Sequence, residues 1–161
     1  MQEEKDARQR LERLIHTHSG MLYRHCYVLL AHPQDAQDTV QDTFLQYLKK
    51  RPALRDEDHE RAWLLTVATN LCRNRHRHRS RHPQVGLEAV AEQSAPTEDT
   101  ALLQAVAALP PKYARVLVLH YIHGYKVGEV AAMLRLTPSA VKMRLQKGRQ
   151  LLKEEVREDP L

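Results

Sequence analysis

The chain has 161 residues, of which 28% are charged and 5% aromatic, and its formal net charge is +5. A chain of this length forms one domain or two small ones. No apolar run approaches the roughly 18 residues that a membrane span requires, so insertion into a membrane is excluded. The charged N-terminus does not read as a signal peptide, and we therefore expect a cytoplasmic protein.

Glycine and aromatic residues are scarce, while Ala, Leu, Arg, Gln and Glu are abundant. This composition, without alternating strand patterns, predicts an all-α fold. Residues 83–97 contain two prolines, a glycine and small polar residues, which is typical of a flexible linker. We therefore expect two small helical domains, at residues 1–82 and 98–161, with the linker between them.

The N-terminal half predicts four helices from its apolar spacing, with Gly20 at the start of the second. They cover roughly residues 5–17, 20–30, 34–50 and 59–77. The apolar residues expected to face the core include Leu14, Ile15, Leu22, Val40, Phe44, Leu48, Trp63, Leu64, Val67, Ala68 and Leu71.

The third of these helices carries an acidic stripe, Asp35, Asp38 and Asp42. Acidic residues early in a helix favour its dipole, and a stripe of this kind is often only a solvated face. Three neighbours of the stripe change this interpretation: Gln41, Phe44 and Leu45. Carboxylates beside an apolar anchor suit a charged, partly desolvated interface, so we predict a protein-docking surface.

Residues 71–82 hold five arginines and no acidic residue. A basic run can be a solvated tail, but the balance favours sequence-tolerant contact with phosphates. Trp63 falls on the apolar stripe and is expected in the core rather than as a wedge between bases.

Cys26 and Cys72 lie in helical patterns and are expected to be small core residues. The ten histidines are scattered and match no spacing of a structural metal site. No glycine-rich phosphate loop or nucleophile–base set is present, so we expect no metal, no cofactor and no catalytic residue.

The C-terminal half predicts helices at roughly 97–108 and 112–123, followed by a pair of helices at 126–134 and 138–152. Thr137 is a good N-cap, and Pro138 suits the first helical position. Val141, Leu145, Gly148 and Leu152 form the inward stripe of the last helix. From Arg135 to Lys153 there are six Lys or Arg and no acidic residue.

This arrangement is typical of a helix-turn-helix whose second helix enters the DNA major groove. The alternative is a helical hairpin with a solvated basic face. The cap, the turn and the one-sided charge favour DNA binding.

Three motifs occur in order along the chain: DAQDTVQDTFLQYLKK, RAWLLTVATNLCRNRHR, and LPPKYARVLVLHYIHGYKVGEVAAMLRLTPSAVKMRLQKGRQLL. Together they resemble bacterial RNA polymerase sigma factors of the extracytoplasmic-function class, over nearly the whole chain. The resemblance implies a promoter-recognition subunit that has no enzymatic activity of its own.

The resemblance also implies roles for individual residues. The helix from Asp35 looks like the segment that docks on the clamp helices of the largest polymerase subunit, through Asp35, Asp38, Gln41, Asp42, Phe44 and Leu45. The loop at 54–61 and the helix after it look like the element that captures the unwound −10 strand, through His59, Arg61, Asn70, Arg73, Arg75 and Arg77. The loop lacks the aromatic residues often found there, so stacking on an extruded base would have to come from His59 or an arginine, or the base would enter a pocket without stacking.

The last helix looks like the reader of the −35 element, through Ser139, Lys142, Met143, Arg144, Gln146 and Lys147. The implied partners are core RNA polymerase, promoter DNA and an anti-sigma factor. The alternative function is a stand-alone helix-turn-helix regulator whose N-terminal domain senses a ligand or dimerises.

Overall fold

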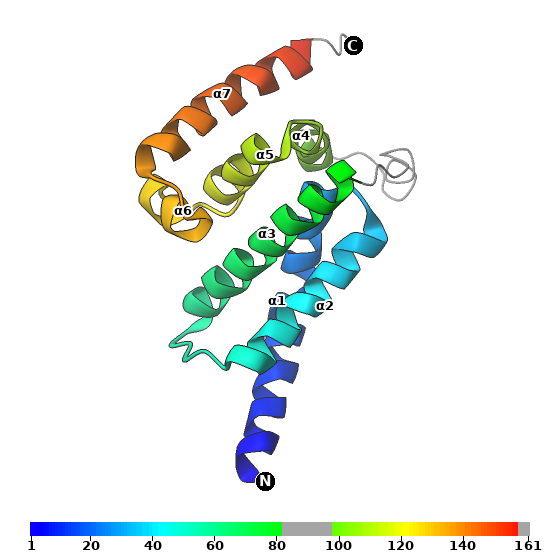
Figure 1. Ribbon diagram of the computed structural model, residues 1–161, viewed down its shortest axis with the longest axis vertical. Helices are drawn as coiled ribbons and strands as arrows, with labels where there is room; N and C mark the ends of the chain where they lie inside the picture. The colour runs from blue at the N-terminus through cyan, green and yellow to red at the C-terminus, as the bar shows by residue number, and fades with distance from the viewer. Residues whose placement is uncertain (82–97, 158–161) are drawn as a thin grey trace. The chain divides into compact units, whose positions relative to one another are not determined.

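The computed structural model describes residues 1–81 and 98–157, and every regular element in these two ranges is a helix (Figure 1). The all-α prediction is therefore confirmed. The chain divides into two compact units, Met1–Gln84 and Val85–Leu161. The linker predicted at 83–97 lies outside the described residues.

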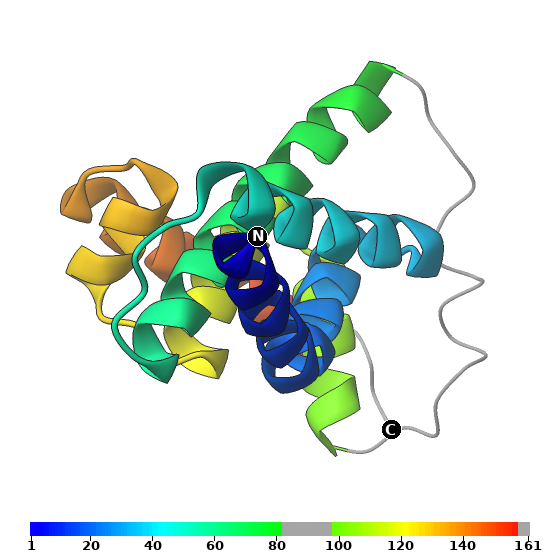
Figure 2. The same ribbon diagram turned by 90° about the horizontal axis from the view of Figure 1, so that it is seen from below.

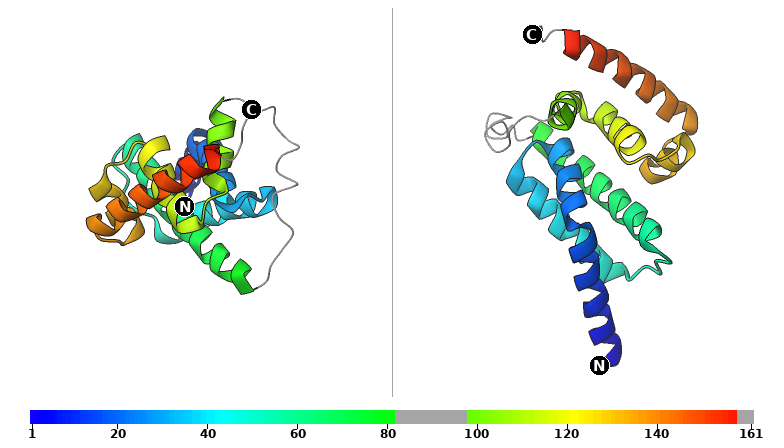
Figure 3. Two further views of the ribbon diagram at one scale, coloured as in Figure 1. Left: turned by 90° about the horizontal axis from the view of Figure 1, so that it is seen from above. Right: turned by 180° about the vertical axis from the view of Figure 1, so that it is seen from behind.

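The first unit is made of three helices that each pack against the other two: α1 (Gln2–Leu30), α2 (Pro33–Lys50) and α3 (Glu57–Arg81). After a short turn α2 runs back along α1 (Figure 3), and Figure 2 views the same bundle from the N-terminal end of α1. The turn contains Ala31 in the left-handed conformation, with φ 53°. His32 then caps α2, because its Nδ1 accepts the Asp35 N–H at 3.1 Å.

The predicted division of residues 5–30 into two helices is wrong, because α1 continues through Gly20. A glycine inside a helix costs only about 1 kcal/mol relative to alanine. Leu14, His18 and Leu22 continue the buried face on both sides of Gly20, so packing outweighs the local preference.

The core of the first unit is contributed by all three helices. Cys26 and Cys72 are fully buried free thiols, as predicted. Ile15 is 39% exposed, so its predicted place in the core is wrong. Trp63 is half-buried and meets the ring of Tyr47 edge-on, with centroids 6.2 Å apart. The most buried apolar side chains are Leu14, Leu22, Cys26, Ala36, Leu64, Leu65, Ala68 and Cys72.

The second unit contains α4 (Glu98–Ala107), α5 (Pro111–Leu117), the π-helical turn η2 (Val118–Ile122), α6 (Val127–Leu134) and α7 (Pro138–Arg157). The sequence predicted one α-helix where α5 and η2 lie. The His123 N–H reaches back five residues to the Val118 carbonyl at 3.0 Å, which widens this last turn.

The helix-turn-helix prediction is confirmed in its local details. Arg135 turns the chain in the left-handed conformation, with φ 58°. Thr137 caps α7, because its Oγ1 accepts the Ala140 N–H at 3.1 Å. Val130 and Val141 are fully buried where α6 and α7 pack together.

Gly148 allows α7 to approach α5 closely. A Cβ built on Gly148 would lie 3.0 Å from Leu117 Cδ1 and 3.2 Å from its Cγ, whereas a Cβ on Gly128 would meet nothing within 4 Å. Leu117 is itself buried and has little room to move. We therefore predict that Gly148→Ala lowers the free energy of unfolding by about 1 kcal/mol through overpacking.

The matched control is Gly128→Ala in the same unit. It should raise the free energy of unfolding by about 0.5 kcal/mol, because alanine favours a helix where no contact is strained. Thermal or urea unfolding measures both changes. Equal stabilisation by the two alanines would contradict the close approach at Gly148.

Candidate nucleic-acid and protein interfaces

The acidic face of α2 reaches the surface beside one exposed apolar side chain. Asp35, Asp38 and Asp42 are partly exposed, and Leu45 is 54% exposed. Gln41 is exposed between them. Phe44, the other predicted apolar anchor, is only 6% exposed and lies in the core. The apolar part of this surface is therefore Leu45.

Two of these carboxylates share a cation from α3. Arg75 Nη2 lies 3.1 Å from Asp42 Oδ2, and Arg75 Nη1 lies 3.9 Å from Asp35 Oδ1. The sequence assigned Arg75 to DNA and the two aspartates to a protein partner. The structure brings all three together within one unit.

The candidate −10 residues divide between two sides of α3. By helical periodicity, His59, Asn70 and Arg77 share the side opposite the fully buried Leu65, Ala68 and Cys72. Arg73 lies at the edge of that side, and its Nε is buried without a hydrogen-bond partner among the described residues. Arg61 and Arg75 fall near the buried side. The prediction that all six residues form one surface did not include this division.

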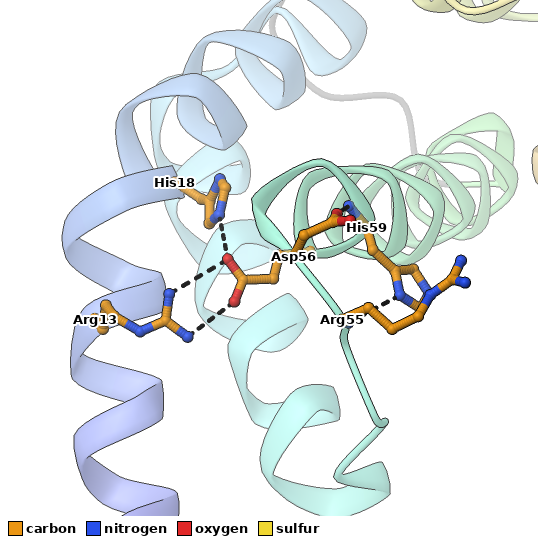
Figure 4. Close-up of polar contacts among 6 residues, drawn as sticks. Arg13, His18, Arg55, Asp56 and His59 are labelled. Atoms are coloured by element: carbon orange, nitrogen blue, oxygen red, sulfur yellow. Dashed lines mark hydrogen bonds and ion pairs between the residues drawn. The ribbon is translucent and has the colours of Figure 1, made fainter.

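The start of α3 is fixed by local hydrogen bonds. Asp56 Oδ1 accepts the His59 N–H at 2.8 Å, which caps the helix. His59 Nδ1 accepts the Arg55 N–H at 3.2 Å (Figure 4). An Nδ1 that accepts a hydrogen bond carries no proton, so in the neutral ring the proton lies on Nε2. The imidazole can therefore offer one N–H donor at Nε2.

A buried carboxylate ties the same end of α3 to α1. Glu60 is 4% exposed, and its Oε2 accepts from Arg13 Nη2 at 2.9 Å. His18 Nε2 lies 3.3 Å from Glu60 Oε1. Figure 4 shows Arg13 and His18 reaching toward this carboxylate from α1. No local pattern in the sequence indicates this cluster, because its members are 42 and 47 residues apart.

The charge on Glu60 is stabilised by its partners. Burial by itself raises the pKa of Glu60, but the hydrogen bonds from Arg13 and His18 and their charges outweigh it, so the pKa lies below its usual value. The same bond raises the pKa of Arg13. Glu60 is therefore ionised at neutral pH.

The exposed face of α7 gathers most of the candidate −35 residues. Ser139, Lys142, Gln146 and Lys147 are exposed, and Met143 is 70% exposed. Arg144 is half-buried at the edge of this face. The opposite stripe, Val141, Leu145 and Gly148, packs inward, so α7 presents its polar side to solvent as the sequence predicted.

The described residues provide neither a metal site nor a membrane span. Among them, no three His, Cys, Asp or Glu side chains lie close enough together to hold a metal ion. None of the helices in residues 1–81 and 98–157 is long and apolar enough to cross a membrane.

The described residues form two all-α units, and the second contains a capped helix-turn-helix. Residues 14–82 match the family described as Sigma-70 region 2, and residues 99–152 match Sigma-70, region 4. The chain is 30% identical to the ECF RNA polymerase sigma factor SigL of Mycobacterium tuberculosis, covering 80% of this chain and 78% of SigL. This chain belongs to the extracytoplasmic-function (ECF) RNA polymerase sigma factors, which act in transcription initiation.

Two further similarities agree with this assignment. The ECF sigma factor SigE of Mycolicibacterium smegmatis is 28% identical over 89% of this chain, which spans 60% of the length of SigE. The fold is similar to that of the sigma factor RpoE in its complex with the anti-sigma factor NepR from Bartonella quintana. The TM-score is 0.69 at 23% identity, over 97% of this chain and 99% of RpoE.

The Glu60 cluster yields a prediction about stability and pH. Arg13→Ala should lower the free energy of unfolding at neutral pH by about 1–3 kcal/mol, because a buried charged acceptor loses its main donor. A carboxylate with a depressed folded pKa contributes stability above its unfolded pKa and loses it as the pH falls through the folded pKa. The difference in the free energy of unfolding between Arg13→Ala and the wild type should therefore become smaller at acidic pH. Urea unfolding at neutral and acidic pH measures it.

The control variant is Arg10→Ala, which removes an exposed arginine from the same helix. It should change the free energy of unfolding by less than about 0.5 kcal/mol. Equal losses from the two variants, or a loss from Arg13→Ala that does not vary with pH, would contradict the assigned role of Glu60.

Proposed function

We propose that the chain is a promoter-recognition subunit that docks on core RNA polymerase through α2 and contacts the −10 element with unit 1 and the −35 element with unit 2. The observation that carries the proposal is the presence, in one chain, of an acidic helix face with an exposed Leu45 and a capped helix-turn-helix with an exposed basic helix.

Docking involves the surface residues Asp38, Gln41, Asp42 and Leu45 of α2. Charged groups around an apolar centre guide the encounter with a cationic partner, and the apolar side chain supplies most of the binding energy. Phe44 supports this surface from beneath by fixing the helix in the core. The proposed partner surface is the clamp-helix region of the largest polymerase subunit.

The −10 contact uses the solvent side of α3, where His59, Asn70 and Arg77 share one face and the half-buried Arg73 lies at its edge. The arginines contact phosphates of the opened strand, and the polar side chains contact a base. The loop before α3 carries no aromatic residue between Leu54 and Arg61. Base selection therefore rests on hydrogen bonds, including the Nε2–H donor of His59.

The −35 contact uses the exposed face of α7, with its N-terminal end toward the base edges. The residues proposed to contact DNA there are Ser139, Lys142, Met143, Arg144, Gln146 and Lys147. The protein acts in the cytoplasm, where core polymerase and promoter DNA are found, and has no catalytic activity of its own.

An anti-sigma factor is a further proposed partner, because the structurally similar RpoE was crystallised with the anti-sigma factor NepR. The alternative of a stand-alone regulator requires a sensor or dimerisation domain in the first unit. The match of residues 14–82 to Sigma-70 region 2 supports the sigma-factor function instead.

The proposal is tested by run-off transcription with purified core polymerase from the source organism and fragments of its genome. The chain should direct specific transcripts only when core polymerase is present. Leu45→Ser should weaken binding to core polymerase about tenfold or more, because it removes the exposed apolar centre of the docking surface.

The matched control is Ile15→Ser, which removes a partly exposed apolar side chain from α1. It should leave core binding within about twofold of wild type. Failure of the wild-type chain to bind core polymerase or to direct transcripts would refute the proposed function. If the two variants change binding to core polymerase equally, Leu45 is not the apolar centre of the docking surface.

The −35 helix yields a prediction about specificity. Lys142→Ala should relax the preference at one or two −35 positions, because a good base contact contributes about 1–3 kcal/mol of discrimination. Lys153, exposed further along α7, is expected to contact phosphate, so Lys153→Ala should weaken binding evenly across sequences. Holoenzyme binding to a promoter library randomised at −35 measures both. If both variants lower affinity evenly on every sequence, α7 binds DNA without reading it.

A further inference from the structure

Arg75 occupies the acidic face that is proposed to receive the polymerase. Its two terminal nitrogens lie 3.1 Å from Asp42 Oδ2 and 3.9 Å from Asp35 Oδ1. The two aspartates are seven residues apart on α2, so one guanidinium spans two turns of the acidic stripe. The Arg75 side chain is 30% exposed, and that of Asp42 is 48% exposed. The contact is therefore open to competition from an incoming cation.

Arg75 changes the charge that the acidic face presents. Asp35 and Asp42 together carry two negative charges, and Arg75 between them leaves one. His32 Nδ1 accepts the Asp35 N–H and so offers no proton to the Asp35 carboxylate, and Asp38 accepts from Gln34 Nε2 at 3.0 Å, a neutral contact. An approaching cation therefore meets a weaker field than the two carboxylates alone would produce.

An alternative role for Arg75 is to brace the carboxylates in a fixed geometry for docking. Both aspartates already stand on a continuous helix whose start is capped by His32. An ion pair this exposed contributes little order, because its long side chains stay mobile and solvent screens the attraction. Arg75 therefore weakens the attraction between the carboxylates and an incoming cation more than it helps docking by ordering the carboxylates.

The position of Arg75 on α3 is consistent with this role. It falls near the buried side of α3 and faces α2, whereas Arg73 and Arg77 lie on the opposite side of the helix. Arg73 forms no ion pair with any residue that the structure describes. The two arginines thus have different surroundings although they are two residues apart.

We propose that Arg75 forms ion pairs with Asp35 and Asp42 in the free protein, and that an arginine or lysine of the polymerase replaces Arg75 in these ion pairs when the protein docks. This inference rests on the proposed docking function. It adds that the partner surface is cationic and that Arg75 limits the affinity of the protein for core polymerase. Arg75 is accordingly assigned to the docking surface rather than to the DNA strand.

The test compares Arg75→Gln with Arg73→Gln, which remove the same charge from the same helix. Binding of each fluorescently labelled protein to purified core polymerase is measured at low and at high salt. Arg75→Gln should tighten binding by about two- to fivefold at low salt, and by less at high salt. Arg73→Gln should not tighten it.

The outcomes separate the inference from the function on which it rests. Unchanged or weaker binding by folded Arg75→Gln would overturn the inference, and so would equal tightening by both variants, since that would be an effect of net charge alone. Failure of the wild-type protein to bind core polymerase would instead refute the proposed function. Circular dichroism and thermal unfolding establish that each variant is folded.

A second measurement uses Asp42→Asn in two backgrounds. If Arg75 partly neutralises Asp42, this substitution should weaken core binding less in the wild-type protein than in Arg75→Gln, by about two- to fivefold. Asp38→Asn, whose carboxylate is not paired with Arg75, should have the same effect in both backgrounds. An Asp42→Asn effect that is equal in the two backgrounds, or larger in wild type, would overturn the inference.

Discussion

The burial of one side of α3 is the constraint on which the rest of the first unit depends. Leu64, Leu65, Ala68, Thr69 and Cys72 have no exposed surface, so the helix cannot rotate without exposing several apolar side chains at once. Fully burying one Leu-sized side chain contributes about 1.5–3 kcal/mol. The rotation of α3 is thereby fixed, and with it the side on which each arginine lies. Arg75 meets the carboxylates of α2, Arg77 is exposed, and Arg73 lies on the side of α3 opposite to Arg75.

This constraint also explains why the acidic and basic surfaces of the unit interact. A three-helix bundle places each helix beside both of the others, so an acidic stripe on α2 and a basic strip on α3 are neighbours. Opposite charges on adjacent helices form ion pairs wherever side chains can reach, as Arg75 does with Asp42 at 3.1 Å. The acidic stripe of α2 and the basic strip of α3 therefore neutralise part of each other within the unit.

Local signals in the sequence were sufficient for the helix-turn-helix of the second unit and insufficient for the contacts of the first unit. Thr137, Pro138 and the inward stripe of α7 act over one or two turns, and the helix-turn-helix was predicted from them correctly. The helix boundary predicted at Gly20 was wrong, because the packing of Leu14 and Leu22 on either side outweighs the weak helix propensity of glycine. The Glu60 cluster and the Arg75 pair join residues 33 to 47 positions apart, and only the packing of helices brings them together. The residues of the π-helical turn η2 show no sequence pattern that distinguishes them from an ordinary α-helix.

In the proposed capture of the −10 strand, the loop between α2 and α3 relies on a fixed backbone instead of an aromatic residue. Its first residue, Arg51, ends α2 in the left-handed conformation, with φ 43°. At its other end, Asp56 caps α3, and Glu60 anchors the helix to Arg13 and His18. A base that stacks on an aromatic ring can shift along it, because stacking tolerates many positions. A hydrogen bond requires a donor at a set place, and the bond from the Arg55 N–H to His59 Nδ1 restrains the imidazole and leaves Nε2 as its donor. Selection by hydrogen bonding thus depends on the rigidity that the Glu60 cluster gives to the start of α3.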